Sequence, residues 1–139
     1  MSNDNYKRKR CEHFVGAVSE YTAASAFLKN GFQVYWPSMH QDSVDFVAYK
    51  DGSFKRVQVK TATWTKSGKY KYLPCRTRLT KKYQDINPSE LYDLLVVVAP
   101  DDRLWVIPAE SIVSSNLCLD GTGPSDNRRK EWLKFQQVP

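Results

Sequence analysis

Residues 44–61 read VDFVAYKDGSFKRVQVKT, and this stretch decides the fold of the chain. Aromatic and β-branched residues stand on both sides of Asp51-Gly52, a dipeptide that favours the tight turn of a β-hairpin. The pattern predicts one strand over 44–49 and its antiparallel partner over 54–61. Residues at equal distances from the turn should then face each other across the two strands.

This register places Asp45 opposite Gln58. Because side chains alternate between the two faces of a strand, Asp45, Gln58 and Lys60 share one face. The other face is apolar and carries Val44, Phe46, Val57 and Val59. Opposite residues have Cβ atoms roughly 5 Å apart and diagonal neighbours roughly 7–8 Å apart, so a carboxylate, an amide and an ammonium group can reach one shared ion or phosphate. The alternative is the polar face of an ordinary half-solvated hairpin with a cross-strand charge pair.

A helix is predicted over 13–29, because this segment lacks proline, contains four alanines and ends at Asn30-Gly31, a typical helix stop. At about 100° per residue, Glu20 lies on the face of the smallest residues of this helix. Such a face can approach a sheet closely, and a carboxylate there is costly to bury unless it is paired or binds a cation. In the alternative reading, Glu20 lies at the edge of that face and reaches solvent.

Residues 94–98, LLVVV, are apolar throughout, which is typical of a central strand buried on both faces. A second hairpin is predicted around Ser67-Gly68, joining 61–65 to 69–73. The rest of the chain is expected to hold strands at 32–36 and 104–107, short helical segments after Asn87 and Pro108, a loop over 116–127, and a short amphipathic helix over 126–135.

The composition describes one globular domain of 139 residues with 41% hydrophobic and 13% aromatic residues, which excludes a disordered or collagen-like chain. Residues 1–12 are expected to form a basic flexible arm and 13–139 a single domain. No stretch approaches the roughly 18–20 apolar residues that a membrane-spanning helix needs. Three widely spaced cysteines give neither a disulfide framework nor a zinc site, and a reducing cytosol fits best.

The net charge of +6 favours a polyanionic partner, with nucleic acid first. Charge alone leaves open a protein that simply has excess lysine. Basic residues alternate with aromatic ones in 66–82, which suits contacts to a phosphate backbone, although a solvated charged hairpin is the alternative. The residues expected to contact DNA are Lys66, Lys69, Lys71, Arg76, Arg78, Lys81, Lys82, Arg128, Arg129 and Lys130. His13 and His40 are isolated in the sequence, with no spacing typical of metal ligands.

Glu20 on the helix, Asp45 at a strand, and Gln58-Val59-Lys60 on the partner strand resemble the PD-(D/E)XK nuclease superfamily. The resemblance covers roughly residues 13–110 and implies an α/β, restriction-endonuclease-like fold with a mixed central sheet flanked by helices. The thirteen-residue step from Asp45 to Gln58, and the glutamine in place of the usual acid, are most similar to the compact group I intron homing endonucleases. Archaeal Holliday-junction resolvases come second.

The resemblance implies Mg²⁺-dependent hydrolysis of phosphodiester bonds in double-stranded DNA, with Mn²⁺ as a substitute ion. It gives the metal ligands as Glu20, Asp45, Gln58 and the backbone carbonyl of Val59, and it gives Lys60 the roles of holding the attacking water and stabilising the transition state. Because Gln58 is neutral, the ion should bind less tightly than at an all-acidic site, which keeps a catalytically silent DNA-binding module as an alternative.

Cutting both strands requires two such sites, so a homodimer or homotetramer is expected. The apolar residues Trp132, Leu133 and Phe135 near the C-terminus are the candidate interface. The protein is expected to be cytoplasmic and to associate with DNA.

Overall fold

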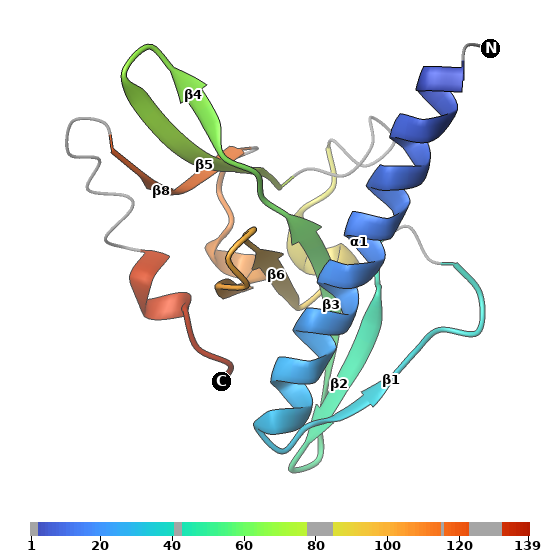
Figure 1. The fold of residues 1–139 in the computed structure, drawn as a ribbon. Coiled ribbons are helices and arrows are strands. Elements are labelled where there is room, and N and C mark those ends of the chain that lie inside the picture. Colours follow the sequence, from blue (N-terminus) through green and yellow to red (C-terminus); the bar gives the residue numbers. More distant parts are fainter. Residues whose placement is uncertain (1–2, 41–42, 78–84, 115, 123–131) are drawn as a thin grey trace.

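The computed structural model describes residues 3–40, 43–77, 85–114, 116–122 and 132–139, with side chains described from Cys11 onward. Figure 1 shows the helices and strands with their labels. In chain order they are α1 (Asn3–Lys29), β1 (Gln33–Tyr35), β2 (Phe46–Lys50), β3 (Ser53–Thr61), β4 (Thr65–Ser67), β5 (Tyr70–Arg76), α2 (Pro88–Leu91), β6 (Leu94–Val98), β7 (Leu104–Pro108), the 3-10 turn η2 (Ala109–Ser111), β8 (Asn116–Gly121) and the 3-10 turn η3 (Leu133–Phe135).

The main sheet has five strands in the order β1-β2-β3-β6-β7. Only the β3–β6 pair is parallel, and the other three pairs are antiparallel. Strand β6 lies between β3 and β7, and all five of its residues are buried. The predicted α/β fold with a mixed sheet around a central LLVVV strand is therefore confirmed.

The β2–β3 hairpin has the register that the sequence predicts, with Phe46 opposite Val57. Asp51 and Gly52 both have positive φ, at 50° and 82°, as a two-residue type I′ turn requires. The pairing continues one residue beyond β2, where the Asp45 backbone N–H donates to the Val57 carbonyl at 2.8 Å.

Helix α1 packs on the face of the sheet formed by the apolar side of this hairpin. Its buried small residues allow the close approach that the sequence predicts. The helix starts at Asn3 rather than at residue 13, so residues 3–12 are helical where the sequence predicts an arm without helical structure. Lysine and arginine are good helix formers and no proline or glycine precedes Gly16, so the basic run continues the helix.

A second, three-stranded sheet has the order β4-β5-β8. The β4–β5 hairpin is present, but it turns one residue later than predicted, so that Lys66 lies opposite Lys71. Residues 116–121 form β8 instead of the predicted loop. Its buried residues Leu117 and Leu119 supply the apolar half of an alternating strand, and the polar, glycine-containing residues around them obscure that pattern.

The apolar residues near the C-terminus pack against the chain itself. Trp132 and Phe135 are partly buried on the core cluster of Leu95, Val97 and Trp105, and the described part of the predicted helix at 126–135 is the short turn η3. Those two aromatic residues are therefore partly used internally, while Leu133 is 57% exposed, and the predicted interface at this segment stays a prediction. Among the described helices, none is long and apolar enough to cross a membrane.

Candidate active site

Asp45 is held at the start of β2 by the neighbouring strand. The Val59 backbone N–H donates to Asp45 Oδ2 at 2.7 Å, while the Asp45 backbone bonds to Val57. Both contacts come from β3, so the carboxyl group has a fixed position beside residues 58–60. The hairpin turn, the antiparallel register of five residue pairs and one backbone donor thus determine where this carboxylate lies.

Glu20 extends from α1 to the same place. Burial, the charge of Asp45 and a hydrogen bond to Asp45 together raise the pKa of Glu20 to about 7, and the nearby His40 opposes part of this rise. The pKa of Asp45 is also raised by burial, although the Val59 N–H, Glu20, Lys60 and His40 all act in the opposite direction. Two carboxyl groups crowded together in this way favour binding of a proton or a cation between them.

Gln58 contributes an oxygen atom that the protein leaves unsatisfied. Its side chain is only 6% exposed, and its amide Nε2 donates to the Val59 carbonyl at 3.3 Å. The other amide atom, Oε1, is buried with no hydrogen-bond partner, which costs about 1–3 kcal/mol. A bound cation would satisfy this oxygen, since amide and carboxylate oxygens are ligands that Mg²⁺ accepts.

Lys60 follows on the same face of β3 and is half-buried. Burial raises the pKa of Cys75 to about 12, and the positive charge of Lys60 opposes part of that rise. The same charge opposes the rise in the pKa of Asp45. The positive charge of Lys60 therefore acts on the Asp45 carboxyl group.

The predicted ligands include only two acidic side chains, Glu20 and Asp45. In the described part of the chain, no group of three or more His, Cys, Asp or Glu side chains is arranged to hold a metal ion. An ion bound here would have two carboxylates, and its other protein ligands would be the Gln58 amide oxygen and a backbone carbonyl. With neutral Gln58, such a set would carry one negative charge fewer than a set with a third carboxylate.

Two features of the site escaped the sequence analysis. His40, interpreted as isolated, lies near enough to lower the pKa of both Glu20 and Asp45. The hydroxyls of Ser19 and Thr61 share a hydrogen bond of 2.6 Å that joins α1 to β3. Ser19 directly precedes Glu20, and Thr61 directly follows Lys60. Nothing in the spacing of Ser19 and Thr61 along the sequence predicts that they are in contact.

The basic hairpin β4–β5 projects from the same end of the sheet at which β3 ends (Figure 1). Lys66, Lys69, Lys71 and Arg76 are all exposed on it. Lys66 and Lys71 lie directly opposite each other, an arrangement of like charges that is unfavourable unless an anion lies between them. The other residues predicted to contact DNA lie outside the described residues: Arg78, Lys81, Lys82, Arg128, Arg129 and Lys130.

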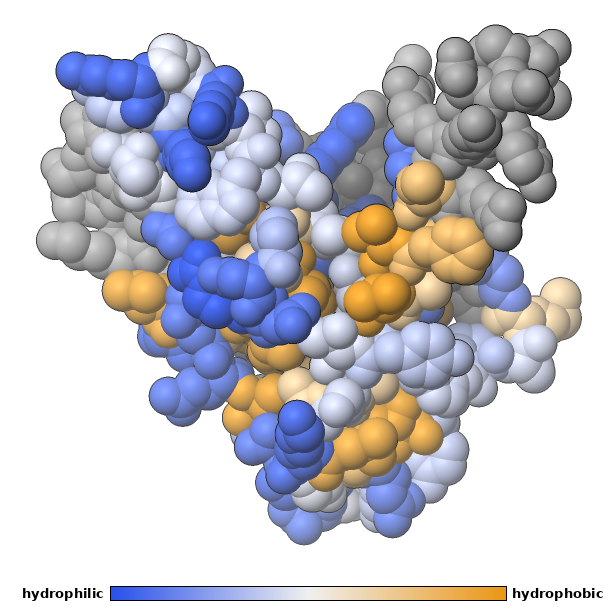
Figure 2. Space-filling model, in the orientation of Figure 1, coloured by the Kyte–Doolittle hydropathy of each residue, from blue (hydrophilic) through white to orange (hydrophobic). Residues whose placement is uncertain are grey.

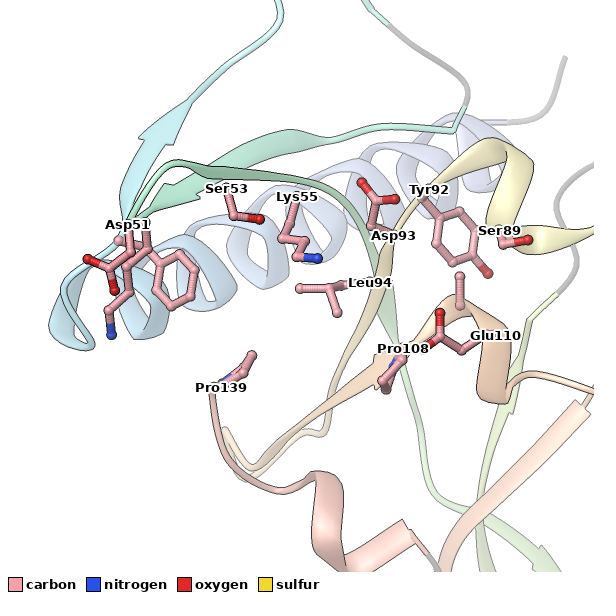
Figure 3. Close-up of a pocket in the computed structure, with 13 residues that line it drawn as sticks. Asp51, Ser53, Lys55, Ser89, Tyr92, Asp93, Leu94, Pro108, Glu110 and Pro139 are labelled. Atoms are coloured by element: carbon pink, nitrogen blue, oxygen red, sulfur yellow. The ribbon is translucent and has the colours of Figure 1, made fainter.

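A pocket of about 510 Å³ lies apart from this site, at the turn end of the β2–β3 hairpin (Figure 3). Two of its charged side chains, Lys50 and Asp93, already have partners. Lys50 Nζ donates to the Asn30 carbonyl at 2.8 Å, and Asp93 forms an ion pair of 3.1 Å with Arg56. None of the predicted catalytic residues lines this pocket, so its volume is unrelated to the carboxylate cluster.

Comparisons with known proteins identify the family and the fold of the chain. Protein 5.3 of Escherichia phage T7 is 39% identical over 109 residues, which cover 77% of this chain and 89% of that protein. The solved structure of the bacterial homing endonuclease I-Ssp6803I has a TM-score of 0.64 at 18% identity, covering 87% of this chain and 90% of that one. This likeness shows the fold. The sequence model of the PD-(D/E)XK endonuclease family matches residues 12–137, and the chain therefore belongs to the PD-(D/E)XK endonuclease family.

Proposed function

We propose that the chain is a Mg²⁺-dependent endonuclease that hydrolyses double-stranded DNA, acting as a site-specific homing endonuclease. The observation that carries the proposal is the buried, unsatisfied Gln58 Oε1 beside two carboxyl groups of raised pKa. Family membership supports a nuclease, and the fold of a bacterial homing endonuclease supports the specific role.

Glu20, Asp45, Gln58 Oε1 and the Val59 carbonyl would hold the Mg²⁺ ion, with Mn²⁺ as a substitute. The ion would polarise the scissile phosphate and lower the pKa of a water molecule. The protein's own part begins with Val59, whose N–H fixes the orientation of Asp45. The lost charge at position 58 lowers the expected affinity for the ion, so millimolar rather than micromolar Mg²⁺ is our expectation.

Lys60 would act on the reaction directly. Its ammonium group is close to Asp45 and can donate to the attacking water and to the phosphate oxygens. The pentavalent transition state carries more negative charge near this group than the ground state does, so Lys60 stabilises it preferentially. A homodimer or homotetramer would supply one such site for each DNA strand.

The proposal is tested by incubating the protein with linear duplex, four-way junction and single-stranded DNA, each with and without Mg²⁺. We expect cleavage of the duplex at a recurring sequence, and only with the ion. Cleavage of the junction regardless of sequence would replace the homing role by junction resolution. Equal binding to all three without cleavage would identify a silent DNA-binding module.

The basic hairpin provides a separate prediction about binding. Replacing Lys69, Lys71 and Arg76 together by alanine should weaken DNA binding and reduce the slope of log K against log salt by as much as roughly three, since each phosphate contact contributes about one. Fluorescence anisotropy at several salt concentrations measures this slope. Alanine at the exposed Lys29, Lys55 and Lys134 removes the same charge elsewhere and serves as the control. If the hairpin variant has the same slope as this control, the basic hairpin does not contact DNA phosphates and is only a solvated charged surface.

Cation binding should depend steeply on pH. Because the folded-state pKa of Glu20 is raised from 4.5 to about 7, the folded protein holds this proton more tightly than the unfolded chain does. The metal-free protein should therefore lose stability as the pH rises between these two values. Below pH 7, a cation competes with the proton, so its affinity should fall by about tenfold per pH unit.

Thermal unfolding with and without Ca²⁺ measures both effects. The rise in Tm on adding Ca²⁺ should be large at pH 8 and small at pH 5.5, and Glu20→Gln should remove the difference. An equal rise at both pH values in the unmodified protein would place the ion away from Glu20.

A further inference from the structure

The outward face of α1 carries a regular apolar seam. Its positions alternate in steps of three and four residues, the spacing of the a and d positions of a coiled coil: Cys11, Phe14, Val18, Tyr21, Ser25 and Leu28. Ser19, Ala23 and Phe27 are buried against the sheet, so the seam lies on the opposite side of the helix. Figure 2 shows hydrophobic residues gathered over the middle of α1.

The large residues of this seam are exposed. The exposed fractions of Phe14, Val18, Tyr21 and Leu28 range from 56% to 68%. Trp36, itself 44% exposed, packs against Tyr21 with ring centroids 5.2 Å apart and widens the surface. At roughly 150–250 Å² per aromatic side chain, the three rings alone expose on the order of 300 Å², already comparable with the largest apolar patch of a typical monomer.

We propose that a second copy of this chain binds here, with the two α1 helices antiparallel in a homodimer. Centred between Val18 and Tyr21, this pairing places Val18 against Tyr21 of the partner subunit. It places Phe14 against Ser25 of the partner subunit, and Cys11 against Leu28 of the partner subunit. Each larger side chain then meets a smaller one, which is what close packing of two helices needs.

Charge selects both the partner and the orientation. Residues 11–28 contain no lysine or arginine, so the seam is unsuited to a phosphate backbone and suited to an apolar protein surface. The four basic residues at 7–10 lie next to it in the sequence. A parallel pair would place the two basic runs side by side. An antiparallel pair places them at opposite ends of a seam about 26 Å long, which is beyond the Debye length of about 8–10 Å.

The oligomer is tested by sedimentation equilibrium of three proteins. The unmodified chain should have the mass of two chains, or of four if these dimers pair further. Val18→Asp should reduce that mass by half or more, with an unchanged far-UV circular dichroism spectrum. The control is Val113→Asp, since Val113 is 90% exposed and lies outside α1; it should leave the mass unchanged. A monomeric unmodified protein, or equal masses for all three proteins, would overturn the proposal.

Orientation is tested with the cysteine that already lies on the seam. Cys11 is free and exposed, so Leu28→Cys should form disulfide-linked dimers on mild oxidation, and adding Cys11→Ser should abolish them. The unmodified chain should give no dimer linked through Cys11. Dimers of the unmodified chain that disappear in Cys11→Ser would mean a parallel pair, and absence of cross-linking in Leu28→Cys would contradict the seam. Both assays are independent of cleavage, so the proposed function can fail while this inference stands.

Discussion

Replacing Lys60 with alanine is expected to reduce the cleavage rate by at least about a thousandfold while changing DNA affinity by less than a few-fold. Lys60 is half-buried beside Asp45, where one ammonium group can act on the reacting phosphate but adds little to the contacts along the DNA backbone. Removing a single donor from a transition state typically costs about 10²–10³ in rate, and here a full positive charge is lost as well.

Single-turnover cleavage and anisotropy binding assays on the same protein separate the two effects. Lys55→Ala is the matched control, because Lys55 is an exposed lysine on the same strand, β3. Retained turnover in Lys60→Ala, or equal losses in both variants, would remove the assigned role of Lys60.

The second large effect is expected for Asp45→Asn. Asparagine keeps an oxygen to accept the Val59 N–H at the position of Oδ2, so the hairpin should stay intact while one of the two anionic ligands is lost. The Mg²⁺ concentration for half-maximal cleavage should rise by at least about tenfold, if cleavage is detectable.

The measurement is the cleavage rate as a function of Mg²⁺ concentration. Asp51→Asn provides the control, because Asp51 lies in the hairpin turn with φ at 50°, a conformation that asparagine also adopts. An unchanged Mg²⁺ dependence in Asp45→Asn would place the ion elsewhere in the protein.

The sequence predicts the main hairpin because its determinants are local. Asp51-Gly52 sets the turn type, the turn sets the register, and alternation assigns Gln58 and Lys60 to one face. The central strand β6 is equally predictable, since five consecutive buried apolar residues leave few alternatives. The hairpin turn and the apolar run of β6 are local sequence features, and together they predict most of the five-stranded sheet.

Other elements depend on contacts between distant segments. Strand β8 exists because Leu117 and Leu119 reach the core beside β5, and no local pattern shows that pairing. The start of α1 was missed for a different reason, because a run of basic residues was interpreted as solvated arm although its helix propensity is high.

The candidate site likewise combines features that the sequence predicts with features that depend on contacts between distant segments. The approach of Glu20 to Asp45 was anticipated from the small-residue face of the helix and from the family resemblance. His40 and the Ser19–Thr61 hydrogen bond were not, because a histidine in a loop and two hydroxyl groups 42 residues apart have no shared periodicity. Only the folded chain brings His40 near the carboxyl groups and Ser19 to Thr61.

The central claim is that the cluster of Glu20, Asp45, Gln58 and Lys60 cleaves DNA with the help of a divalent cation. Its most direct test is to incubate the protein with a library of duplex sequences in Mg²⁺ or in EDTA, and to sequence the new DNA ends. The account predicts ends that recur at one sequence in Mg²⁺ and are absent in EDTA. The same ends at the same rate in EDTA would contradict it.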